Sequence, residues 1–206
     1  MTDVSSFNCL YGRLGILKDQ ATGEPILVLI GGCSRSGKSI LSRTISEKLR
    51  IEGLDCHVVS IDAWLLDVRK RPPGLGVMER YDCRAIVGSI NELLQGRTIY
   101  PPVYDAASRR RIAERGKVGI TVASGVIIVE GVVSLALQEL HAIASLKVYV
   151  NVPDEIRIER LKSFYRDVKK LSMFDTERLI HEREREEVPF IKRTSSDADI
   201  VIENSQ

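Results

Sequence analysis

A glycine-rich octapeptide carries the clearest chemical signal in the sequence. Residues 32–39 read Gly-Cys-Ser-Arg-Ser-Gly-Lys-Ser and match the pattern GxxxxGK[ST]. Such a turn lets backbone N–H groups face phosphate oxygens, and the helix that follows adds the positive end of its dipole. In this pattern the lysine contacts the outer phosphates of a nucleotide and the last hydroxyl reaches Mg²⁺. The predicted contacts to the nucleotide are therefore Gly32, Cys33, Ser34, Arg35, Ser36, Gly37, Lys38, Ser39 and Ile40, with Lys38 also catalytic and Ser39 also a metal ligand.

Two carboxylates follow apolar runs that read as buried strands. Glu130 ends the run 126–130, and Asp62 follows the run 58–61. Parallel sheets bind their ligands at the carboxyl ends of the strands, so both acids are expected at one edge. Glu130 is the predicted metal-side carboxylate, the alternative being an ordinary acid at a turn. Asp62 is predicted to accept the proton of an acceptor hydroxyl, the alternative being a helix cap.

Two aromatic-acid pairs are candidates for binding the acceptor. Tyr81-Asp82 and Tyr104-Asp105 each offer one ring and one hydrogen-bond acceptor to a polar substrate. Asp82 could instead cap the helix predicted to follow it, and Tyr104 could belong to the core.

Arginines recur in two segments that could meet phosphate. One is the cluster 109–111, and the other is a predicted helix with Arg157, Arg160 and Arg166. A helical arginine that closes over the γ-phosphate would stabilise the charge of the transition state, whereas the alternative is a solvated face paired with acids. For Arg157 the favoured interpretation is that it lies on a solvated helix face and pairs with acidic residues. Arg160 and Arg166 are the predicted catalytic arginines, since they lie towards a candidate lid at 169–174.

Hydrophobic periodicity supplies the elements that must position these residues. Short apolar runs rich in branched residues predict buried parallel strands at 25–30, 58–61, 126–129, 146–150 and 200–202. Helical spacing predicts helices at 38–49, 82–94, 134–144, 154–170 and 176–187, the last ending before Pro189. Residues 7–17 are expected to form a small strand or hairpin. The sequence thus predicts one α/β domain over 1–206, with 1–25 an N-terminal extension of unknown role.

Composition limits the partners of the protein. The 206 residues carry 30 basic and 28 acidic side chains, a net charge of +2, so no overall field marks nucleic acid or membrane as a partner. The arginine cluster lacks interleaved aromatics for base stacking, and no apolar run reaches membrane-spanning length. Four scattered cysteines favour a reducing cytoplasm. The alternating charges of 182–187 read as a solvent-exposed helix surface with no chemistry.

Together, these motifs resemble the uridine kinase and phosphoribulokinase family of P-loop kinases. The segments that carry the likeness, in chain order, are GGCSRSGKS, VVSID, RYDCRAI, YPPVYD, VIIVEGVV, KVYVNVPDEIRIER, YRDV and DADIVIEN. The resemblance implies a P-loop fold with a five-stranded parallel sheet flanked by helices, a small β-hairpin in the acceptor region and a mobile lid. It also implies that Asp62 is the catalytic acid-base residue, and that Arg160 or Arg166 belongs to the lid. Asp82 and Tyr104 match positions that contact the acceptor.

Two departures from the family pattern concern the acceptor. Leu65 stands where uridine kinases carry an aromatic residue, and Arg109 falls where they carry a histidine after the YD pair. A planar guanidinium suits a phosphate or carboxylate, so Arg109 is a predicted acceptor contact.

Two functions from different classes compete at this point. The favoured one is ATP- and Mg²⁺-dependent phosphorylation of a hydroxyl on a nucleoside, a sugar or another small molecule. The alternative is a regulatory P-loop ATPase without a small-molecule acceptor, because a phosphate loop alone does not define an acceptor. Assembly into a homo-oligomer is left open.

Overall fold

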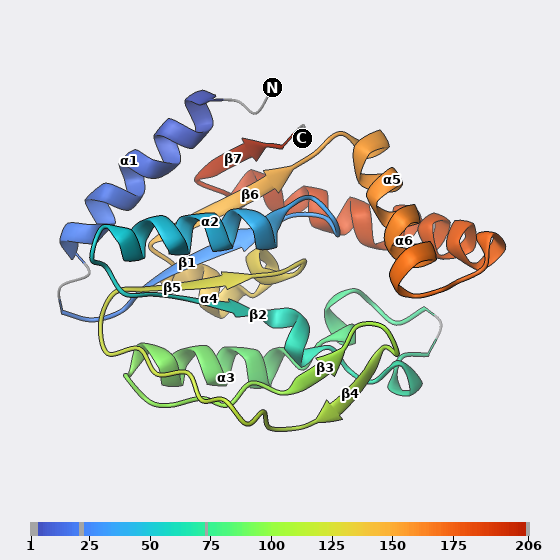
Figure 1. The fold of residues 1–206 in the computed structure, drawn as a ribbon, viewed down its shortest axis with the longest axis horizontal. Coiled ribbons are helices and arrows are strands. Elements are labelled where there is room, and N and C mark those ends of the chain that lie inside the picture. Colours follow the sequence, from blue (N-terminus) through green and yellow to red (C-terminus); the bar gives the residue numbers. More distant parts are fainter. Residues whose placement is uncertain (1–3, 21–22, 73, 205–206) are drawn as a thin grey trace.

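A five-stranded parallel sheet forms the centre of the computed structural model, which describes residues 4–20, 23–72 and 74–204. Its strands are β1 (Ile26–Gly31), β2 (Cys56–Ser60), β5 (Val126–Glu130), β6 (Leu146–Asn151) and β7 (Ile200–Glu203). They lie in the order β2-β5-β1-β6-β7 (Figure 1), and every pairing is parallel. Each predicted apolar run forms one of these strands, so the predicted parallel α/β core is confirmed.

Helices α1 (Val4–Gln20) and α2 (Lys38–Ile51) cover one face of the sheet. Alternate residues of β1, Val28 and Ile30, are fully buried in the cluster on this face. Ile45 of α2 packs into the same cluster, as the helical spacing of its apolar residues predicts. A strand buried on both faces requires a continuous apolar run, which is the pattern that identified β1 in the sequence.

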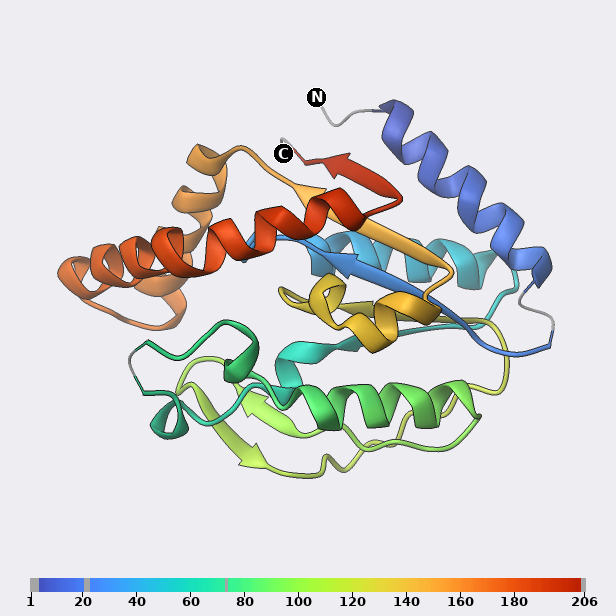
Figure 2. The same cartoon turned by 180° about the vertical axis from the view of Figure 1, so that it is seen from behind.

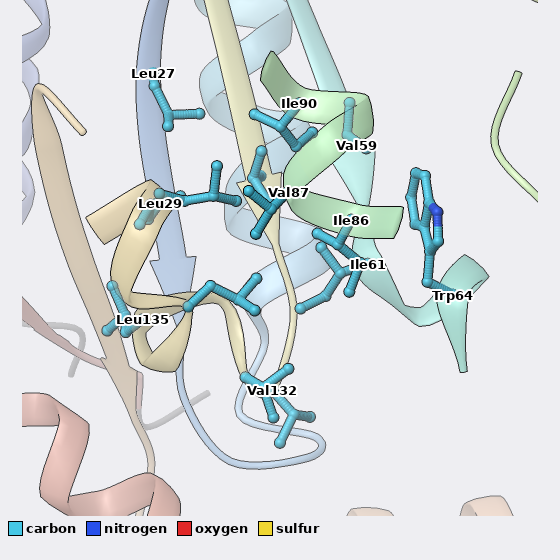
Figure 3. Close-up of a cluster of buried hydrophobic side chains, with 14 of the residues drawn as sticks. Leu27, Leu29, Val59, Ile61, Trp64, Ile86, Val87, Ile90, Val132 and Leu135 are labelled. Carbon is cyan, nitrogen blue, oxygen red and sulfur yellow. The ribbon is translucent and has the colours of Figure 1, made fainter. Parts of the chain in front are cut away.

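Helices α3 (Cys83–Leu94), α4 (Gln138–Ile143) and α6 (Met173–Arg193) cover the opposite face, which Figure 2 shows from behind. The other residues of β1, Leu27 and Leu29, lie in this second cluster. Figure 3 shows them on the side where Ile86 and Ile90 of α3 also lie, with Trp64 at the edge of the cluster. Trp64 lies two residues after Asp62 in the same helical turn, so burial of its ring fixes the backbone that carries this carboxylate.

Smaller elements extend from the carboxyl edge of the sheet. Strands β3 (Val103–Asp105) and β4 (Arg110–Ala113) form an antiparallel hairpin, as expected for the acceptor region. Helix α5 (Asp154–Ser163) continues into one π turn, η5 (Phe164–Val168), and the chain then returns along α6 (Figure 1). Single turns complete the fold: η1 (Ile61–Trp64), η2 (Val68–Lys70), η3 (Met78–Arg80), η4 (Ser134–Ala136) and η6 (Thr194–Asp197).

The prediction of a strand or hairpin at residues 7–17 is wrong, because these residues lie within α1. Leu10 and Leu14, one helical turn apart, are buried in the cluster that also contains Ile200 and Ile202 of β7. Local propensity is weak here, and packing against the sheet decides the conformation. None of the helices among the described residues is long and apolar enough to cross a lipid bilayer.

Three predicted helix boundaries are also wrong. The helix predicted at 176–187 runs from Met173 to Arg193 and passes through Pro189. Val188 and Ile191 are buried in the core around this proline, and their packing outweighs the lost N–H donor. The helix predicted at 154–170 changes to a π turn at Phe164, and the one at 134–144 divides into η4 and α4.

Arg157 is a buried arginine that joins α5 to α6 through ion pairs with two partly exposed carboxylates. Its side chain is 1% exposed, and it donates to Asp154 and Glu184 at 3.1 and 2.7 Å. The predicted pairing with Asp154 is thus present, but the predicted solvated face is wrong for this residue.

The variant Arg157→Met is expected to lower the free energy of unfolding by about 2 kcal/mol, the value of strong charge-assisted hydrogen bonds. Both carboxylates can rehydrate because they are partly exposed, which keeps the loss below that of a fully buried pair. Denaturant unfolding measures this change. Lys162→Met, which removes the exposed pair with Glu159, is the matched control and should change stability by less than about 0.5 kcal/mol.

Candidate active site

The phosphate loop joins β1 to α2 and is shaped by two glycines with positive φ. Gly32 has a φ of 138° and Gly37 a φ of 104°. A Cβ on Gly32 would lie 2.4 Å from the carbonyl oxygen of Val150, and one on Gly37 would lie 2.2 Å from Nδ2 of Asn204. Both the backbone conformation and the close packing therefore require glycine. Sequence and structure agree on where this loop begins and where the helix starts, at Lys38.

Lys38 lies buried in the floor of the loop. Its Nζ donates to the carbonyl oxygen of Cys33 at 2.8 Å. Burial lowers the pKa of Lys38, while the nearby carboxylates of Glu130 and Asp62 act in the opposite direction. The buried hydroxyl of Ser36 has no hydrogen-bond partner within the described part of the chain. A buried ammonium and an unpaired hydroxyl in one loop fit a site that receives phosphate oxygens.

Ser39 and Glu130 bring two oxygen ligands together beside this loop. The hydroxyl of Ser39 donates to Oε2 of Glu130 at 3.2 Å, and Glu130 is only 5% exposed. Burial raises the pKa of Glu130, and hydrogen bonding to Ser60 together with the charge of Lys38 lowers it. Mg²⁺ is usually held by one or two protein oxygens plus phosphate oxygens and water, so these two side chains fit it. Among the described residues, no group of three His, Cys, Asp or Glu side chains forms an all-protein metal site.

Asp62 lies at the same edge of the sheet as Glu130. In the register of β2 and β5, Ser60 is opposite Glu130, and Asp62 follows two residues later on η1. The N-cap of η1 is Ser60, so Asp62 does not act as the cap. The carboxylate opens into a cavity and accepts a hydrogen bond from the Tyr81 hydroxyl at 3.4 Å. The enclosing cavity walls raise the pKa of Asp62, and the positive charge of Lys38 partly offsets this effect.

Two residues of α6, Arg183 and Glu187, form part of this site, although the sequence pattern indicated a solvent-exposed surface. Arg183 Nη1 donates to Ser34 Oγ at 2.9 Å and to Glu187 Oε1 at 3.0 Å. Ser34 Oγ donates to Glu187 Oε1 at 3.1 Å, and Glu187 is only 6% exposed. The prediction that residues 182–187 form a solvent-exposed helix surface is therefore wrong for these two residues. Their four-residue spacing places them beside the buried Ile180 and Ile191, a signal that the charge pattern obscured.

Of the two predicted lid arginines, the structure brings one to the phosphate loop. Arg160 Nη1 donates to the carbonyl oxygen of Arg35 at 3.0 Å, and the Arg35 guanidinium lies 3.6 Å from the centre of the Phe164 ring. Arg166 is 69% exposed and pairs with Asp167 at 2.9 Å. Arg160 lines the cavity and Arg166 does not.

One cavity of about 1560 Å³ joins the phosphate loop to the acceptor region. Its lining includes most of the predicted site residues, namely Ser34, Arg35, Gly37, Lys38, Ser39, Ile40, Asp62, Tyr81, Tyr104, Arg109, Glu130 and Arg160. Asp82 is not among the lining residues. It accepts from the backbone N–H of Ala85 at 3.2 Å and caps α3, which is the alternative that the sequence left open.

The acceptor end of the cavity contains a residue that the sequence analysis did not single out. Arg71 donates to the hydroxyl of Tyr104 and to the carbonyl oxygen of Arg109. Arg109 itself has a φ of 58°, a conformation that costs a residue other than glycine of order 1 kcal/mol. No motif marks Arg71, because its place depends on how the loop after η2 folds against the hairpin.

The fold and the loop together define a P-loop nucleotide-binding protein. A uridine kinase from Clostridium novyi is 30% identical over 154 residues, which cover 71% of this chain and 70% of that protein. A uridine kinase from Ligilactobacillus salivarius is 29% identical over 153 residues, 71% of this chain and 68% of that protein. Among solved structures, a candidate kinase of a fructose transport system from Silicibacter sp. TM1040 aligns with a TM-score of 0.74 at 24% identity, covering 92% of this chain and 96% of that one.

The model of the phosphoribulokinase/uridine kinase family matches residues 78–206. This match covers more than half of the chain, and the chain belongs to that family. It is therefore an ATP-dependent small-molecule kinase, as the sequence predicted.

Proposed function

We propose that this protein transfers the γ-phosphoryl group of ATP to a hydroxyl of a nucleoside, a sugar or a sugar derivative, with Mg²⁺ as the metal. The observation that carries the proposal is the position of Asp62, which lies within the same cavity as Lys38 of the phosphate loop. A phosphate loop alone would suit any nucleotide-binding protein. A second carboxylate that opens into the cavity suits the binding of an acceptor hydroxyl beside the phosphate.

Each chemical role can be assigned to a side chain of the site. The acceptor oxygen forms a bond to the γ-phosphorus while the bond from that phosphorus to the β–γ bridging oxygen breaks, which releases ADP. The hydroxyl proton passes to the Asp62 carboxylate, whose raised pKa makes it a better proton acceptor than an ordinary aspartate. Lys38 and Arg183 supply positive charge where charge develops on the phosphoryl oxygens.

Mg²⁺ would be held by Ser39 and Glu130, whose oxygens already lie 3.2 Å apart. The ion would supply positive charge that offsets the charge of the phosphate groups. Glu187 has a positioning role, because it holds Arg183 and the loop residue Ser34 together.

The experiment that tests the proposal measures ADP release from ATP and Mg²⁺ with a panel of nucleosides, free sugars, sugar phosphates and hydroxy acids. Stimulation by one class of acceptor, with stoichiometric formation of its phosphate ester, is the expected result. ATP turnover that no acceptor stimulates would contradict the proposal and would favour a regulatory ATPase.

The variant Ser39→Ala is expected to raise the Mg²⁺ concentration for half-maximal rate by about tenfold, because one metal contact is lost. The maximal rate at saturating Mg²⁺ should fall much less. Titration of the initial rate with Mg²⁺ measures both quantities. The control is Thr44→Ala, which removes an exposed hydroxyl on the same helix. An equal shift in the Mg²⁺ concentration for half-maximal rate in that variant would contradict the metal role of Ser39.

A further inference from the structure

The acceptor end of the cavity contains three cations that lack an acidic partner. Arg71, Arg109 and Lys169 all line this cavity. Within the described ranges, none of the three has a carboxylate oxygen within 4.0 Å. Four other arginines of the cavity are paired: Arg80 with Glu186 and Glu187, Arg178 with Asp175, Arg183 with Glu187 and Arg185 with Glu186. Arg35 and Arg160 lie at the phosphate loop, where Arg160 donates to the carbonyl oxygen of Arg35 and the Arg35 guanidinium faces the Phe164 ring. The acceptor end of the cavity therefore holds three positive charges with no carboxylate close to them in the described part of the chain.

The three cations also lie near one another. Arg71 Nη2 donates to the carbonyl oxygen of Arg109 at 3.4 Å. Burial, together with the charges of Arg109, Arg183, Arg71 and Arg35, lowers the pKa of Lys169 to about 8. Burial and the charge of Arg71 likewise lower the pKa of Arg109. Lys169 also lowers the pKa of Asp105, but that carboxylate is occupied by the backbone N–H groups of Ala107 and Ser108.

Arg71 provides an independent sign of a missing ligand. Its Nε is buried and has no hydrogen-bond partner in the part of the chain that the structure describes. An unpaired charged donor is costly, so this atom favours an outside partner that accepts a hydrogen bond, such as an anion or water. A guanidinium beside a second guanidinium and an ammonium offers several N–H donors to one oxyanion.

Two members of this cluster, Arg71 and Arg109, lie at the β-hairpin, whereas Lys169 lies by the Phe164 ring that also faces Arg35 of the phosphate loop. The largest influences on the pKa of Asp62, apart from the cavity walls, are Lys38, Glu187, Arg183 and Tyr81. Arg71 and Arg109 instead lie with Tyr104 of the β-hairpin, the region expected to contact the acceptor. An anion bound there would belong to the far end of a molecule whose hydroxyl reaches Asp62.

We propose that the acceptor is an anionic alcohol, which carries a phosphate or carboxylate group held by Arg71, Arg109 and Lys169. This inference rests on the proposed kinase function and narrows its substrate class. It separates the protein from enzymes whose acceptor is a neutral nucleoside. The free acceptor hydroxyl is the group phosphorylated, and the existing anion serves only for binding.

The first test measures anion binding without catalysis. Inorganic phosphate is titrated by calorimetry into protein saturated with a non-hydrolysable ATP analogue and Mg²⁺, so that the phosphate loop is already filled. Arg109→Gln and Arg71→Gln should each weaken phosphate binding at least tenfold, and Arg109→Lys should restore part of it. Lys117→Gln, which removes an exposed positive charge downstream of the same hairpin, is the matched control and should leave binding unchanged. Equal phosphate affinity in Arg109→Gln and Lys117→Gln would overturn the inference.

The second test compares matched acceptors: ribose with ribose 5-phosphate, glycerol with glycerate, and uridine as a neutral nucleoside. The anionic member of a pair should have the higher kcat/KM, and Arg109→Gln should raise its KM at least tenfold with little change in the KM for ATP. The phosphate and carboxylate pairs show which anion is preferred. Efficient turnover of a neutral acceptor that is insensitive to Arg109→Gln would refute the anionic class but leave the kinase function intact, whereas the absence of any stimulated turnover would refute the kinase function itself.

Discussion

Replacing Asp62 by asparagine is expected to lower kcat by about 10³-fold while the affinity for ATP stays nearly unchanged. Asparagine keeps the size and the hydrogen bond to Tyr81 but cannot accept a proton. Because the side chain acts on the acceptor hydroxyl, the loss should appear after nucleotide binding. Steady-state kinetics with a stimulating acceptor and equilibrium binding of an ATP analogue measure the two effects separately.

The pH dependence supplies a control for this role. The pKa of Asp62 is raised, so in the native enzyme kcat/KM should fall as the pH drops through a value above the ordinary range of aspartate. The residual activity of Asp62→Asn should lack this acidic limb. Asp55→Asn, at an exposed carboxylate near β2, should retain both the limb and the rate. A near-normal kcat in Asp62→Asn would exclude the proton-acceptor role.

Replacing Arg183 by methionine is expected to lower kcat by about 10²-fold, as the loss of one preorganised positive group at a phosphoryl-transfer site does. The guanidinium contacts both Ser34 of the phosphate loop and Glu187. Burial opposes its charge, but Glu187 raises the pKa of Arg183, so the group stays charged at every accessible pH. Single-turnover measurements of phosphoryl transfer detect the loss.

A structural role for Arg183 would give a different result. Glu187 is buried, so Arg183→Met also leaves a carboxylate without its main partner. The double variant Arg183→Met/Glu187→Leu should recover stability in thermal unfolding without recovering kcat. Arg193→Met, at an exposed position near the end of the same helix, is the control. Recovery of the rate in the double variant would show that the arginine acts only on stability.

The fold could be predicted from the sequence where a local pattern has one structural solution. The β1 run is short, apolar, rich in branched residues and followed by glycines, which is typical of a strand buried on both faces, and the glycine pattern requires the turn at Gly32 and Gly37. The ends of helices were harder to predict from the sequence, because they depend on packing against distant segments. Pro189 is an ordinary stop signal, yet Val188 and Ile191 are held in the core on both sides of it.

The residues of the site also divide into those that a local pattern predicts and those whose place depends on packing. Lys38, Ser39, Asp62 and Glu130 were predicted because each follows a recognisable strand or belongs to the loop motif. Arg183 lies in a run of alternating charges, which ordinarily marks a solvated helix face. Its role depends on which side of α6 faces the phosphate loop, and only the packing of distant segments determines this.

Helix α1 has a consequence for how the molecule behaves in a crowded solution. β7 is the last strand on its side of the sheet, and such a strand can pair with a strand of another chain. Helix α1 lies beside β7 (Figure 1). Leu10 and Leu14 of α1 pack into the same cluster as Ile200 and Ile202 of β7. The helix therefore buries apolar surface beside that edge, so its loss would expose Ile200 and Ile202 next to the edge of the sheet.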